Sequence, residues 1–166
     1  MQPIMKKNIA IIAGGDSSEF PVSMNSARTI ENALDQNRYN VYKIIVQGTD
    51  WKLIDEEREI AVNKDDFSCK IQGEHLHFDC AVILIHGTPG ENGVLQGYFE
   101  TLRIPYSTCG VLSSSLTFNK IFSKQYISQF NIDISRFRII QQGESYKPGE
   151  IVKNLGLPCF VKPNRG

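Results

Sequence analysis

The chain has 166 residues, of which 41% are hydrophobic, and this length suits one domain of ordinary size with a short extension. Its 18 basic side chains balance its 18 acidic ones, so the positive excess expected of a nucleic-acid-binding protein is missing, and no apolar stretch is long enough for a membrane span or a signal peptide. Four scattered cysteines without CxxC spacing predict reduced thiols and a cytoplasmic protein.

The first part of the chain predicts strands that alternate with a helix. Residues 8–13 form a short, continuous apolar run, which is typical of a buried parallel strand, and two glycines end it. Pro21 and Ser23 open a helix whose apolar residues recur at near-helical spacing, and a second strand follows over residues 41–46. Such a strand–helix–strand unit favours a parallel sheet.

The next part of the chain changes its pattern and then returns to it. Residues 58–78 alternate between apolar and polar types, which predicts a small antiparallel excursion with a turn at Gly73. The parallel pattern resumes with a strand at residues 80–85, a helix at 94–102 and a short strand at 104–106. The order predicts a three-layer α/β fold with a mainly parallel, Rossmann-like sheet.

The last part of the chain predicts the start of a second domain. A serine-rich turn at residues 113–115 leads to a helical stretch at 119–130. A helix opened by Pro148 and a strand at residues 159–162 follow. We place the domain boundary near Thr117.

Five motifs occur in a fixed order along the chain. They are GGxSxE at 14–19, VSxxSA at 22–27, HGxxGExGxxQG at 86–97, IPYxxxGVxxSSLxxxK at 104–120 and VKP at 161–163. Together they resemble the D-alanine–D-alanine ligases, a family of the ATP-grasp superfamily, and the resemblance covers nearly the whole chain. The combination is far more specific than any single glycine motif.

The resemblance implies a division of the chain and a reaction. Residues 6–117 would form the N-terminal substrate-binding α/β domain, of the pre-ATP-grasp type, and residues 118–166 the beginning of the central ATP-grasp domain. The chain is shorter than such ligases, so it corresponds to their N-terminal portion. The parent enzyme would be a homodimer that joins two D-alanines through an acyl phosphate, with ATP and Mg2+, for peptidoglycan precursors in cell wall biogenesis.

The chain alone is expected to be inactive. In the family, the loop that covers the phosphates and the residues that bind Mg2+ lie beyond the VKP segment. No HxxE, CxxC or paired-carboxylate set in this sequence predicts a metal site of its own.

The glycine turn at residues 14–19 precedes a helix start, where backbone N–H groups and the helix dipole favour an anion or a charged small molecule. A carboxylate there, Glu19, would attract an ammonium group, and by resemblance it holds the amino group of the first D-alanine. By resemblance Val22 packs on the substrate methyl group and Ser23 supports the loop. The alternatives are a solvated Glu19, a core Val22 and an ordinary helix-start Ser23.

His86 stands where a strand ends and a glycine-rich loop begins, at the edge where α/β proteins bind ligands. An imidazole there could orient a substrate or interact with charge at a reacting carboxylate. Glu91 is expected to position this loop rather than to act as an acid or base. A purely structural histidine is the alternative. Many family members have aspartate where this chain has Asn92.

Lys120 and Lys162 are the candidate ATP-binding residues. By resemblance both lysines reach ATP phosphates, where a positive charge stabilises the phosphoryl group in transfer. Each could also be an ordinary surface lysine.

Two other functions stay open from the sequence. A related ATP-grasp ligase could take D-lactate or D-serine as its second substrate. A noncatalytic α/β module could bind a small metabolite in the same crevice, because the fold alone does not fix function.

Overall fold

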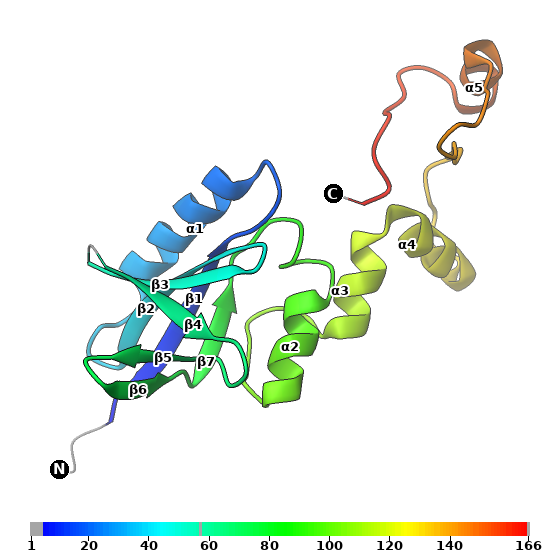
Figure 1. Cartoon of the computed structure of the whole chain (residues 1–166). Helices are drawn as coiled ribbons and strands as arrows, with labels where there is room; N and C mark the ends of the chain where they lie inside the picture. The colour runs from blue at the N-terminus through cyan, green and yellow to red at the C-terminus, as the bar shows by residue number, and fades with distance from the viewer. Residues whose placement is uncertain (1–4, 57, 166) are drawn as a thin grey trace. The chain divides into compact units, whose positions relative to one another are not determined.

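The computed structural model describes residues 5–56 and 58–165. The chain forms two compact units, one that ends at Ser115 and one that begins at Leu116. The first unit contains the sheet, and the second contains helices and extended segments (Figure 1). None of the described helices has the length and apolar character that crossing a membrane requires.

The first unit is built on one seven-stranded sheet with the strand order β6-β5-β4-β3-β2-β1-β7 (Figure 1). Its strands are β1 (Lys7–Gly14), β2 (Tyr39–Gln47), β3 (Asp50–Asp55), β4 (Arg58–Asn63), β5 (Ser68–Ile71), β6 (Glu74–His77) and β7 (Cys80–Ile83). β1 pairs in parallel with β2 and with β7, whereas the pairs from β2 through β6 are antiparallel. The expected α/β fold with an antiparallel excursion is confirmed, and its parallel strands β2, β1 and β7 lie at one end of the sheet.

The antiparallel part begins earlier than the sequence analysis expected. Gln47 of β2 pairs with Asp50 of β3, so only Gly48 and Thr49 connect the two strands. Gly48 has a φ of +53°, a left-handed conformation that glycine adopts at low cost in such tight hairpins. At the other end of the sheet, the strand expected at residues 104–106 is reduced to a single bridge between Tyr106 and Ala81.

Two helices cover opposite faces of the sheet and give the expected three layers. They are α1 (Phe20–Ala33) and α2 (Val94–Leu102). Successive side chains of a strand point to opposite faces, and the alternation in β1 divides the core accordingly. Ile11 and Ala13 pack with Ala27 of α1, whereas Ala10 and Ile12 belong to the cluster that contains residues of α2.

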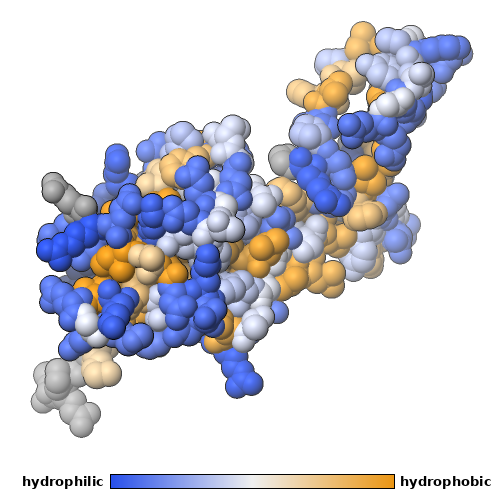
Figure 2. Space-filling model, in the orientation of Figure 1, coloured by the Kyte–Doolittle hydropathy of each residue, from blue (hydrophilic) through white to orange (hydrophobic). Residues whose placement is uncertain are grey.

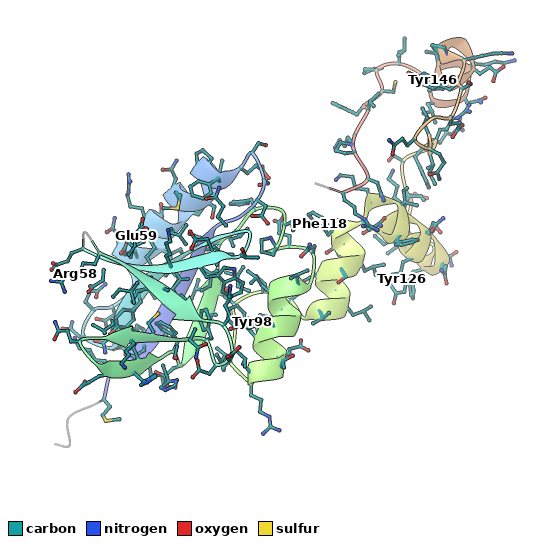
Figure 3. The ribbon with its side chains drawn as sticks, in the orientation of Figure 1. Arg58, Glu59, Tyr98, Phe118, Tyr126 and Tyr146 are labelled. Atoms are coloured by element: carbon teal, nitrogen blue, oxygen red, sulfur yellow. The ribbon has the colours of Figure 1, made fainter. Side chains whose placement is uncertain are left out.

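The core on the α2 face is centred on Phe67, which is fully buried. Its ring centroid lies 4.9 Å from that of Phe99 and 5.2 Å from that of Phe78, and Tyr98 (labelled in Figure 3) and Trp51 complete the cluster. Phe67 also has a φ of +53°, which is unfavourable for a bulky side chain. Its packing must therefore offset a local backbone cost.

The second unit has a different character. α3 (Val111–Phe118) crosses the division between the units, and α4 (Lys120–Ile127), the 3-10 turn η1 (Ser128–Phe130) and α5 (Pro148–Leu155) follow. Within the described residues, all the buried hydrophobic side chains lie between Ile9 and Phe99. Apolar side chains of the second unit instead reach the surface (Figure 2). The most exposed are Phe122, Phe130, Ile132, Tyr146, Leu157, Phe160 and Val161.

Two local predictions in this region were wrong. Ser113–Ser115 lie inside α3 and do not form a turn, since helical serines can satisfy their hydroxyls locally: Ser114 Oγ donates to the carbonyl of Cys109 at 3.1 Å. Residues 159–162 do not form a strand, because none of the described segments pairs with them. An apolar run without a partner strand has no ladder to join.

Replacement of Phe67 by alanine should destabilise the first unit by about 3 to 5 kcal/mol, because it removes a large buried ring from the aromatic cluster. Urea denaturation of the wild type and the variant measures the difference in the free energy of unfolding. Val94→Ala is the control, since Val94 is 58% exposed. It should change stability by less than about 0.5 kcal/mol, and equal losses for the two variants would contradict the assigned core.

Limited proteolysis should cut the second unit before the first. A segment with little buried apolar surface opens at low free energy, and protease cleavage follows such openings. Mass spectrometry of the early products should place the first cuts after Leu116 and leave the residues around β1 and α1 intact. First cuts within the sheet would contradict this difference in stability.

Candidate functional site

The candidate site lies where β1 and β7 end side by side. We call the segments that follow these strands loop A (residues 15–19) and loop B (residues 86–93). Two hydrogen bonds join the loops: the N–H of Asp16 donates to the carbonyl of Thr88 at 3.0 Å, and Ser17 Oγ donates to the carbonyl of His86 at 2.8 Å. The carboxyl ends of adjacent parallel strands are where α/β sheets bind ligands.

Two glycines allow the loops to come this close. Gly15 has a φ of +97°, and a Cβ there would lie 2.5 Å from Cγ2 of Ile85. A Cβ on Gly90 would lie 2.5 Å from the carbonyl oxygen of Ile85. Any side chain at either position would push loop A or loop B away from Ile85.

Ser23 connects the two strand ends through its side chain. It is fully buried, its Oγ accepts a hydrogen bond from the N–H of Gly14 at 2.9 Å, and it donates to the carbonyl of Leu84 at 2.8 Å. Both backbone groups lie where the sheet ladder stops. The Ser23 hydroxyl thus links α1 to the strand ends from which loop A and loop B start.

Glu19 and Val22 project from the first turn of α1. The carbonyl of Glu19 accepts the N–H of Ser23, but its carboxylate makes no capping bond to the helix. The side chain of Glu19 is exposed, and Val22 is 49% exposed although it is apolar. A carboxylate and an apolar surface are thus available to a ligand beside loop A.

His86 and Glu91 belong to loop B. The His86 side chain is half-buried, and its Nε2 lies 3.5 Å from Oγ of Ser26 on α1. Glu91 Oε2 accepts the N–H of Gly87 at 2.8 Å, and the N–H of Glu91 donates to the carbonyl of Gly87 at 2.8 Å. The Glu91 carboxylate is thus engaged in holding the backbone next to His86, as a positioning residue would be.

The structure brings the five candidate substrate residues to one edge of the sheet. They are Glu19, Val22, Ser23, His86 and Glu91. The hydrogen bonds account for Ser23 and Glu91 as supports, whereas Glu19, Val22 and His86 present surface to a ligand. Their contacts with a substrate stay a prediction.

Three residues of this region were missed by the sequence analysis: Ser17, Ser26 and Gln96. Gln96 is fully buried, and its Nε2 donates to the carbonyl of Gly90 at 2.6 Å and to Oγ1 of Thr108 at 2.9 Å. All three are polar residues at defined positions of the sequence motifs. A polar residue at a core position of a helix, as in Gln96, was the available signal.

Lys120 and Lys162 belong to the second unit. The backbone N–H of Lys120 donates to the carbonyl of Asn164 at 3.1 Å, and the N–H of Ile121 donates to Asn164 Oδ1 at 3.0 Å. These bonds place the segment that carries Lys162 beside the start of α4. Lys162 is exposed, with its Nζ 5.6 Å from the ring centroid of Phe160. Two lysines distant in sequence are thus brought to one end of this unit.

Residues 5–56 and 58–165 contain no group of three or more histidine, cysteine, aspartate or glutamate side chains that could hold a metal ion. We therefore assign none of these residues to a metal.

Comparison with known proteins gives one consistent result. A family model described as D-ala D-ala ligase N-terminus matches residues 8–109. The D-alanine–D-alanine ligase of Phocaeicola vulgatus is 46% identical over 163 residues, which are 98% of this chain and 50% of that protein. The chain thus spans about half the length of the curated relatives it matches.

Solved structures of ligases have the same fold. The D-alanine–D-alanine ligase from Bacillus anthracis complexed with ATP is 30% identical, with a TM-score of 0.71 over 96% of this chain and 48% of that chain. The VanG D-Ala:D-Ser ligase from Enterococcus faecalis is 27% identical, with a TM-score of 0.75 over 97% of this chain and 53% of that chain.

Replacement of Ser23 by alanine should cost about 1 to 3 kcal/mol of stability, because it leaves the Gly14 N–H and the Leu84 carbonyl without their partner. Urea denaturation measures the change. Thr29→Ala is the matched control on the same helix, since the Thr29 hydroxyl is exposed and donates only to the carbonyl of Asn25. If the two variants lost the same stability, Ser23 would not be the link between the strand ends.

Proposed function

We propose, since the chain belongs to the D-ala D-ala ligase N-terminus family, that it supplies the site for the first D-alanine in an ATP-dependent ligase that makes D-alanyl-D-alanine for peptidoglycan precursors. The observation that carries the proposal is the meeting of loop A, loop B and the start of α1 at one sheet edge. It places Glu19 and His86 on the two loops that hydrogen bonds hold together.

The chemistry of this edge suits a small zwitterion. The carboxylate of Glu19, which makes no capping bond to the helix, would bind the ammonium group of D-alanine, and a charged hydrogen bond of this kind is among the stronger ones in proteins. The exposed side chain of Val22 would pack against the substrate methyl group. His86 would orient the substrate carboxylate, with its backbone held by Ser17 and Glu91.

The second unit would bind ATP. Lys120 and Lys162 lie at the end of the unit where Asn164 meets the start of α4, and two positive charges in one place favour a polyanion such as a triphosphate. The ATP complex of the Bacillus anthracis ligase is consistent with this part of the proposal. Mg2+ would accompany ATP in the whole enzyme, and no described residue is assigned to it.

In the whole ligase the first D-alanine carboxylate would take the terminal phosphoryl group of ATP and release ADP. The amine of the second D-alanine would then attack the acyl carbon, lose a proton and displace phosphate. Activation of the carboxylate divides a difficult condensation into two easier steps. We expect the enzyme to be a homodimer in the cytoplasm, where ATP and the reduced state of its four free cysteines are both maintained.

A D-serine ligase is the second candidate, because the Enterococcus faecalis D-Ala:D-Ser ligase shares the fold over nearly all of this chain. The edge formed by loop A, loop B and the start of α1 concerns only the first substrate, for which both ligases would need the same groups. A metabolite-binding module without catalysis has less support, because the relatives are ligases.

In the whole ligase, Glu19→Gln should lower kcat/KM for the first D-alanine by about ten- to a hundredfold, because the loss of the charge weakens the bond to the substrate ammonium. The saturation constant for ATP should stay nearly unchanged. Lys162→Met should have the opposite pattern, with ATP use impaired first. Steady-state kinetics with each substrate varied in turn separates the two effects.

Matched variants control for the change of charge itself. Glu74→Gln on β6 and Lys153→Met at the end of α5 make the same replacements at exposed positions outside both sites, and they should leave the kinetics near wild type. A Glu19→Gln enzyme with unchanged D-alanine kinetics and a raised constant for ATP would show that the first substrate does not bind at loop A.

A further inference from the structure

We propose that Ser26 is a positioning residue that fixes the ring of His86 with its proton on Nε2 and leaves Nδ1 as the nitrogen available to a ligand. The inference rests on the proposed function in one respect, namely that His86 meets the substrate. It adds that Nδ1 is the atom of His86 that contacts the substrate, and that Ser26 sets the tautomer of the ring. The observation behind it is the 3.5 Å contact between Ser26 Oγ and His86 Nε2.

The hydroxyl proton of Ser26 determines the direction of this contact. Ser26 Oγ lies 3.0 Å from the carbonyl oxygen of Val22, one helical turn earlier, and serines inside helices commonly donate to that carbonyl. A hydroxyl has one proton to donate and two lone pairs to accept with. With the proton given to Val22, Ser26 can only accept, so Nε2 of His86 must carry a hydrogen.

The other residues that hold loop B bind its backbone, whereas Ser26 contacts the ring of His86. Ser17 binds the carbonyl of His86, and Glu91 binds the N–H of Gly87, so both fix the backbone and not the imidazole. Within the described stretches, Ser26 is the one side chain with a hydrogen bond to the ring. Contacts of this length in ligand-free sites often shorten when the substrate is bound.

This arrangement has a chemical consequence at the proposed site. A neutral ring with Nε2–H has a bare Nδ1, and a proton gained by the ring goes to Nδ1 while the bond to Ser26 stays in place. Nδ1–H could then donate to a substrate carboxylate oxygen. Because Ser26 and Glu19 both belong to α1 or its cap, one helix would set the spacing between the groups that meet the two ends of D-alanine.

The tautomer can be measured without any substrate, on the 166-residue chain labelled with 15N. Long-range 1H–15N spectra at alkaline pH report which ring nitrogen carries hydrogen. The chain has three histidines, and His75 and His77 on β6 are internal references outside the site. We expect His86 to be the Nε2–H tautomer in the wild type.

Ser26→Ala should lower the ratio of Nε2–H to Nδ1–H at His86 by about two- to tenfold, the amount that one net hydrogen bond supports. Ser26→Thr keeps the hydroxyl and should restore the wild-type ratio. Thr29→Ala removes a hydroxyl with the same bond to a preceding carbonyl on the same helix, and it should have no effect.

An Nδ1–H tautomer in the wild type would overturn the proposal, and so would an unchanged ratio in Ser26→Ala. The wild-type spectrum decides the first point even where a variant folds poorly. These outcomes are distinct from a failure of the proposed function, since the spectra contain no D-alanine or ATP and the kinetic test of Glu19 does not depend on the tautomer of His86.

Discussion

The buried hydroxyl of Ser23 is the interaction on which the rest of the site depends. Two parallel strands end next to each other, and at that point the Gly14 N–H and the Leu84 carbonyl have no further strand to pair with. A buried backbone group without a partner is costly, so a side chain must supply the missing bonds. Ser23 supplies both and thereby fixes the start of α1 to the strand ends.

With α1 fixed to the strand ends, loop A and loop B must pack closely around Ile85. The absence of a Cβ at Gly15 and Gly90 lets both loops approach Ile85 closely. Gly15 and Gly90 contribute no side chain, so the candidate functional side chains come from positions that flank the glycines. Glu19 at the helix start and His86 at the strand end are in those positions.

The sequence predicted the elements whose signal is local and missed those that depend on a partner. The helix at 94–102 has the expected bounds because the spacing of its apolar residues and the glycine before it both indicate a start at Val94. The hairpin strand β3 was missed although Gly48 and Thr49 form a two-residue connection. Residues 159–162 have the composition of a strand but no partner, and the pairing of strands cannot be seen in composition. The candidate substrate residues were found through motifs, whereas the supports Ser17 and Gln96 emerged only from contacts.

The two units also differ in how their functional groups are held. In the first unit, buried hydrogen bonds and a packed core fix Ser23 and the backbone of His86 before any ligand arrives, so little ordering remains to be done on binding. In the second unit, Lys162 is exposed and follows an extended segment, and Asn164 two residues later accepts hydrogen bonds from the backbone at the start of α4. A polyanion bound by the two lysines would add attractive charge interactions to this unit. The ordering of this unit is therefore expected to depend on its ligand much more than that of the first unit.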